Sequence, residues 1–237
     1  MSDQPATGNF LLDQLPASDR AAIGADLVPL QFEARQVLYR PGEPIEYVYF
    51  PSGCGLSVLT IMENGDCVEI GTIGREGLSG SQLIFHAFRP ESEMICQVPG
   101  DAFALTTDRF LEHFESAPML RHLVFGYTES MFNFMGQSIA CNRLHNLNER
   151  CARWLLSMQD RVGRSQFYLT QEFLAMMLGT TRPAVTLTAL ALQEAGLIRY
   201  NRGNLAIVDR DGLERAACEC YGVTARTLAR TLAIPLN

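Results

Sequence analysis

The pattern of apolar and polar positions distinguishes three segments along the chain. Residues 28–107 hold short apolar runs separated by turn residues, and residues 119–147 repeat apolar positions every three or four residues. Two shorter helical patterns and a pair of strand patterns follow from residue 170. Because a helix repeats about every 3.6 residues and a strand every two, the chain is predicted to hold a β-rich segment, a long helix and a mixed segment.

The first segment has the texture of an antiparallel β domain. Turn residues such as Pro41-Gly42 and Pro99-Gly100 divide it, and Asn64-Gly65 joins two alternating runs as the clearest hairpin. Many short strands at regular intervals predict a small antiparallel barrel or jelly roll. The predicted strands are residues 28–32, 36–40, 47–50, 55–62, 67–73, 93–98 and 101–106.

The long helical pattern runs from Met119 to Leu147 and has a heptad seam. Its apolar positions alternate spacings of four and three, which is typical of helices that pair with each other. The seam consists of Leu120, Val124, Tyr127, Met131, Phe134, Ser138 and Cys141. We predict a homodimer along it; the alternative is a helix that packs on its own barrel. Asn142, Asn146 and Asn148 weaken the helical preference, so a hinge is predicted there.

The third segment has the order of a helix-turn-helix. Thr170 can cap a first helix that runs to about Leu178, and Gly179 suits the left-handed conformation that closes it. Thr180 or Thr181 can cap the second helix, and Pro183 falls in its first turn, where no hydrogen bond is lost. Another amphipathic helix, Glu149 to Val162, is predicted to precede this pair.

The second helix has a clear buried face and is followed by a wing. Val185, Ala189 and Leu192 recur at helical spacing, which leaves the opposite face to solvent. Residues 197–208 then form two strand patterns around Asn-Arg-Gly-Asn, typical of a tight hairpin. Residues predicted to point outward are Arg182, Thr186, Leu187 and Leu190.

Together these features resemble the Crp/Fnr family of bacterial transcription regulators. The resemblance rests on the helix pair with its wing, on Pro41-Gly42-Glu43-Pro44-Ile45, on Tyr49-Phe50-Pro51 and on Ile73 to Gly80. It implies an α+β fold with an amino-terminal cyclic-nucleotide-binding-type barrel or jelly roll in residues 1–117. A dimerisation helix and hinge would occupy 118–147, and a winged helix-turn-helix domain with a helical extension 148–237.

The resemblance also implies partners. In the family the second helix of the pair enters the major groove of double-stranded DNA, and a twofold dimer reads half-sites about one turn apart. Arg182 can clamp a guanine edge or a phosphate, although a surface salt bridge is the alternative. RNA polymerase is an expected partner. The predicted DNA-contacting residues are Thr170, Gln171, Thr180, Thr181, Arg182, Thr186, Arg199 and Arg202.

The effector pocket departs from the family pattern. Glu76, Gly77 and Leu78 fit the cassette that holds a cyclic nucleotide, but Glu91 followed by Ser92 stands where the phosphate-binding arginine is expected. An acid would repel a cyclic phosphate. Arg89 could take the role of the expected arginine only if the loop shifted. We therefore expect a pocket not tuned to cAMP, with an unknown small-molecule effector or none; a cyclic-nucleotide-gated regulator is the alternative.

Charge supports the division into domains. The net charge is -7, and all 19 basic residues are Arg. From residue 148 onward 11 Arg and 8 acids give +3, whereas the preceding part has 8 Arg and 18 acids, or -10. Only the basic part is expected to approach phosphate. MSDQPATGNF lacks a signal pattern and no run is long enough to span a bilayer, so we expect a cytoplasmic protein without membrane contact.

Cysteine and histidine spacing predicts no metal site, cofactor or enzyme activity. Seven cysteines are an odd number, and Cys218-Glu219-Cys220 has no second Cys/His pair nearby to complete a four-ligand zinc site. We therefore expect mostly buried, inert thiols. Two alternatives stay open: a thiol switch at Cys141 or Cys151, and haem ligation by His86 or His122.

Overall fold

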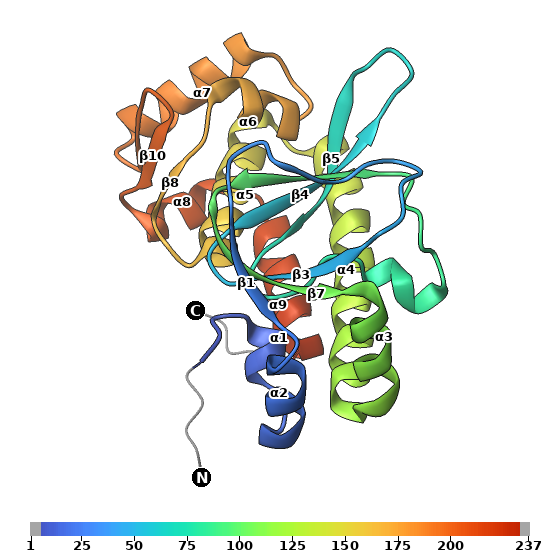
Figure 1. The fold of residues 1–237 in the computed structure, drawn as a ribbon. Helices are drawn as coiled ribbons and strands as arrows, with labels where there is room; N and C mark the ends of the chain where they lie inside the picture. The colour runs from blue at the N-terminus through green and yellow to red at the C-terminus, as the bar shows by residue number, and fades with distance from the viewer. Residues whose placement is uncertain (1–5, 233–237) are drawn as a thin grey trace.

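The computed structural model describes residues 6–232 (Figure 1). The first five residues, which belong to the segment assessed for a signal pattern, lie outside this range. Two short helices, α1 (Phe10–Asp13) and α2 (Ala17–Gly24), open the chain. Asn9 caps α1 by accepting hydrogen bonds from the backbone N–H groups of Leu11 and Leu12, and its own amide donates to the carbonyls of Pro51 and Gly77.

Seven strands then form two antiparallel sheets. One sheet has the order β1-β7-β3 and the other β2-β6-β4-β5. The sheets stay open rather than closing into one barrel, so the jelly-roll form of the predicted α+β fold is the one that holds. The strands are β1 (Val28–Phe32), β2 (Val37–Tyr39), β3 (Tyr47–Pro51), β4 (Gly55–Ile61), β5 (Cys67–Ile73), β6 (Glu93–Val98) and β7 (Gly100–Thr106).

The predicted hairpin at Asn64-Gly65 is confirmed. β4 and β5 pair from Leu56 opposite Ile73 to Ile61 opposite Cys67. Gly65 takes a positive φ of 86°, which a side chain would disfavour. Between β5 and β6 the chain makes a short 3-10 helix, η1 (Ser81–Phe85).

A helical layer covers one side of the sheets. α3 (Thr107–Ser116) follows β7, and α4 (Pro118–Leu144) is the long helix (Figure 1). It ends at Leu144 with His145 as its C-cap. Asn146 then begins α5 (Leu147–Val162) with a reciprocal cap: its side chain accepts from Glu149 N–H and the Glu149 carboxylate accepts from Asn146 N–H. The break thus falls within the predicted hinge.

The heptad seam of α4 packs inside its own chain, which corrects its assignment as the dimer interface. Each of its seven residues is at most 8% exposed. The jelly roll covers the first part, with Leu120, Val124 and Tyr127 in the core shared with the sheets. A side chain already covered by its own chain has no surface left to bury against a second copy.

The carboxy-terminal part begins with α5 and then forms the helix-turn-helix and its wing. The small sheet has the order β8-β10-β9, and residues from the helices and this sheet share a second core. Within residues 6–232, no single helix is long and apolar enough to cross a bilayer. The elements are β8 (Gln166–Tyr168), α6 (Gln171–Met177), α7 (Arg182–Glu194), β9 (Ile198–Asn201) and β10 (Asn204–Ile207).

The chain then returns to the long helix. After α8 (Arg210–Ala216), α9 (Cys220–Leu232) packs along α4, so the extension covers the long helix as well as the DNA-binding part (Figure 1). Gly126 of α4 permits this approach, since a Cβ there would lie 3.0 Å from the carbonyl oxygen of Thr231.

Candidate nucleic-acid interface

α6 and α7 form the predicted helix-turn-helix. Their axes meet at 104°, within the range typical of this motif. Thr170 and Thr181 cap the two helices by accepting from the N–H groups of Phe173 and Ala184, and Gly179 in the turn has a φ of 57°. Val185, Ala189 and Leu192 are buried as predicted, whereas Leu187 and Leu190 are exposed.

One groove gathers predicted contact residues from three separate elements. Its walls include Thr170 and Gln171 at the start of α6, Arg182 at the start of α7, and Arg202 at the wing tip. Within the described residues Arg182 makes no ion pair, and its side chain lies at the surface. Two guanidinium groups, a hydroxyl and an amide therefore face one open groove, a set of donors that suits a phosphodiester backbone.

The remaining predicted contacts are spread around this groove. Thr180 is half-buried in the turn, and Arg199 is exposed on β9 outside the groove. The hydroxyl of Thr186 donates to Gln171 Oε1 over 2.8 Å, which ties α7 to the start of α6. Glu172 also lines the groove. Its carboxylate lies 3.8 Å from the guanidinium of Arg35 in the jelly roll, and both side chains are exposed.

α5 holds the helix-turn-helix against the sheets of the same chain. The indole of Trp154 donates to Glu69 Oε1 over 2.9 Å, and Arg161 Nε lies 3.1 Å from Glu76 Oε1. Arg75 N–H donates to the Arg161 carbonyl over 3.0 Å. Burial raises the pKa of Glu69, although hydrogen bonds from Ser57 and Trp154 oppose that effect.

Comparison with known proteins agrees with this geometry. The family model of the Crp-like helix-turn-helix domain matches residues 149–216. The chain carries a Crp-like helix-turn-helix domain. This span includes α6, α7, the wing and the groove, so the groove belongs to the DNA-binding domain.

Solved structures extend the likeness to the whole fold. FixK2 from Bradyrhizobium japonicum is 13% identical and covers 81% of this chain and 98% of its own, with a TM-score of 0.64. CLP from Xanthomonas campestris, a c-di-GMP responsive global regulator, is 15% identical with coverages of 81% and 99% and the same TM-score. TTHB099, a CRP-family regulator from Thermus thermophilus, is 16% identical and covers 79% of this chain and 96% of its own, with a TM-score of 0.65. A comparison with curated proteins finds no match.

These findings confirm the predicted resemblance: the Crp-like domain stands in a Crp/Fnr architecture.

The predicted effector residues, however, do not share one cavity. Glu76 is buried against Arg161, and Leu78 lies in the core. Gly77 faces the Tyr127 ring, where a Cβ would come within 2.0 Å. Glu91 and Ser92 line a different cavity from Glu76, so the single predicted pocket is corrected to two places.

The cavity of Glu91 and Ser92 lies between the jelly roll, η1 and α4. Its volume is about 460 Å³, and its wall is mainly apolar. Arg89 is the one arginine among its lining residues, and it donates to the Gly42 carbonyl over 2.7 Å. Ser81 and Gln82 of η1 also line it, whereas Glu76 does not. Phe132 and Met135 form part of the wall that α4 contributes.

The outer face of α4 carries three large apolar side chains that residues 6–232 leave exposed. Phe125, Phe132 and Ile139 follow one another at intervals of seven and are 48%, 64% and 74% exposed. We call these three residues the outer stripe. It lies on a different face from the seam, and sequence periodicity did not single it out because both faces hold apolar residues.

The positions of the histidines and of Cys151 bear on the two alternatives left open by the sequence, haem ligation and a thiol switch. His86 and His122 are exposed and do not line the cavity, so the cavity offers neither as a haem ligand. Burial raises the pKa of the Cys151 thiol to about 12, which makes it a poor nucleophile for a redox switch.

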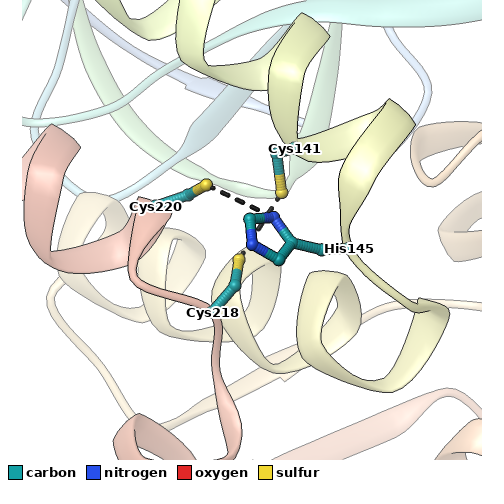
Figure 2. Close-up of side chains that lie close together, drawn as sticks. All are labelled: Cys141, His145, Cys218 and Cys220. Atoms are coloured by element: carbon teal, nitrogen blue, oxygen red, sulfur yellow. Dashed lines mark hydrogen bonds between the residues drawn. The ribbon is translucent and has the colours of Figure 1, made fainter.

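The expectation that Cys218 and Cys220 lack a second Cys/His pair is wrong. Cys141 and His145, separated by one helical turn of α4, lie beside them, and one ligand atom from each residue falls within 4.8 Å of the others (Figure 2). The sequence signal was Cys-x3-His on a helix, but its partner pair lies more than 70 residues away.

Proposed function

We propose that this chain is a sequence-specific transcription regulator that binds a palindromic DNA site as a homodimer. The observation that carries the proposal is the groove in which Arg182, Arg202, Thr170 and Gln171 converge from three elements. In this assignment α7 enters the major groove, and its exposed Leu187 and Leu190 favour contact with thymine methyl groups. RNA polymerase is the partner through which such a regulator would act.

The outer stripe of α4 supports the homodimer. Paired helices bury residues that repeat every seven positions, as Phe125, Phe132 and Ile139 do. A twofold axis beside α4 would place two helix-turn-helix units side by side, and a palindromic site mirrors that symmetry.

The cavity beside α4 supports an effector other than a cyclic nucleotide. A cyclic phosphate needs an available cation, but Arg89 is engaged with Gly42, and Glu91 adds a negative charge nearby. The mainly apolar wall suits a mainly apolar ligand. Because Phe132 belongs both to this wall and to the outer stripe, a bound ligand would act directly on the dimer contact.

Selection of random duplex DNA by the purified full chain tests the proposal, at one fixed salt concentration and with and without cyclic nucleotide. We expect enrichment of a palindrome without nucleotide. Enrichment only with nucleotide would overturn the effector assignment, and a single unrepeated half-site would overturn the homodimer.

Two arginine substitutions test the division of labour within the groove. Arg182→Ala is expected to cost about 1–3 kcal/mol on the selected site and to relax preference at one base pair, since a base contact is lost. Arg202→Ala is expected to weaken selected and random duplex alike, because a phosphate contact carries no sequence information. Binding is measured by fluorescence anisotropy, with exposed Arg40→Ala on the jelly roll as control. Equal losses for both variants on both duplexes would contradict this division.

A further inference from the structure

The junction between α4 and α9 brings together four side chains with the chemistry of a metal site. Cys141 lies in the last turn of α4 and His145 caps that helix, whereas Cys218 lies just before α9 and Cys220 begins it (Figure 2). The three thiols are buried, and the imidazole is largely covered. Neither the DNA-binding groove nor the apolar cavity includes any of them.

The spacing of the donor atoms matches a single tetrahedral ion. Cys141 Sγ lies 3.5 Å from Cys218 Sγ, and Cys220 Sγ lies 3.6 Å from His145 Nδ1. Zinc bonds of about 2.3 Å to sulfur and 2.0–2.1 Å to nitrogen, at tetrahedral angles, separate two sulfurs by about 3.8 Å and sulfur from nitrogen by about 3.6 Å. A [4Fe–4S] cluster would need wider spacing, since each of its four ligands binds a different iron.

Groups around the donors also fit a bound cation. The second imidazole nitrogen, Nε2, lies 3.1 Å from Glu219 Oε2, the arrangement by which a carboxylate orients a metal-binding histidine. Gln137 donates to Cys220 Sγ over 3.0 Å. Three thiolates and one Zn²⁺ leave a net charge of -1, and Arg153 is buried near Cys141, where its Nε has no hydrogen-bond partner among the described residues.

We propose that Cys141, His145, Cys218 and Cys220 bind one zinc ion in a closed Cys₃His site that fastens α9 to the hinge end of α4. Thiolate and imidazole donors in tetrahedral geometry favour zinc among the common divalent metals. With all four positions filled by protein, the site is structural and leaves no place for a reacting water. Binding displaces the thiol protons, which are released to solvent.

Metal content of the full chain is the first test. The protein is purified under reducing conditions without chelators or metal columns, and zinc is counted by mass spectrometry. We expect one zinc per chain, lost in Cys141→Ser and Cys218→Ser but kept in Cys67→Ser, which changes a less buried cysteine on β5. Zinc retained in both site variants would overturn the assignment, and so would iron in place of zinc.

Two further measurements remain informative if the buried cysteine variants fail to fold. Cobalt added to the metal-free wild type should give the visible absorption of a tetrahedral ion and a thiolate charge-transfer band. Glu219→Gln, at a side chain 73% exposed, should weaken zinc binding at least about tenfold yet still allow one ion at saturation. No cobalt bands, or an air-formed Cys141–Cys218 disulfide in a chain that takes up no zinc, would replace the metal site with a thiol switch.

Discussion

The two faces of α4 differ in what covers them, although both are apolar. The inner face, with Leu120, Val124 and Tyr127, is sealed by the jelly roll, and α9 packs along the same helix. The outer stripe, from Phe125 to Ile139, stays exposed within the described chain. One face therefore contributes to the stability of the single chain, whereas the other is available to a second copy. A heptad of apolar residues indicates that a helix is covered, but it does not say by what.

The inner face should give the largest change when truncated. Leu120→Ala is expected to lower the free energy of unfolding by about 2–5 kcal/mol, because Leu120 is 1% exposed and its removal leaves a cavity. Chemical denaturation measures the loss. Leu144→Ala, 75% exposed on the same helix, is the matched control and should stay within about 0.5 kcal/mol. If both substitutions cost the same, the distinction between the faces fails.

A charge on the outer stripe should act on association and leave the single chain intact. Phe132→Asp is expected to raise the dimer dissociation constant at least about tenfold, or about 1.4 kcal/mol, because a carboxylate would be buried between two helices. Sedimentation equilibrium measures this constant, and Glu129→Asp, on an exposed acid of α4, serves as control. A Phe132→Asp chain that dimerises as tightly as wild type would remove the outer stripe from the interface.

A glycine on the outer face gives the smallest and most discriminating effect. A Cβ at Gly136 would meet nothing within 4 Å in the single chain. In the Phe132→Asp background, Gly136→Ala should raise the free energy of unfolding by about 0.5–1 kcal/mol, because alanine favours helix more than glycine does. A smaller gain in the wild-type background would place the partner helix against Gly136, and equal gains would exclude contact there. Thermal unfolding of the four chains supplies the comparison.

Local chemistry explains why much of the Crp-like domain was predictable from sequence. Thr170, Gly179, Thr181 and Pro183 act on their own or neighbouring backbone groups, so their roles are written in adjacent residues. The same holds for the wing, where Arg202 and Gly203 take the positive φ angles that a tight hairpin requires. Strand periodicity likewise located β1 to β7 with few errors at their ends.

Long-range packing decided what the sequence left open. The seam of α4, the separation of Glu76 from Glu91, and the meeting of Cys141 and His145 with Cys218 and Cys220 all depend on how distant segments pack. By itself the sequence determined the elements, their order and the capping residues, because these follow from contacts over a few residues. Only the tertiary structure decided which face of α4 is covered and which cysteines share a site, because those contacts join positions far apart in the chain.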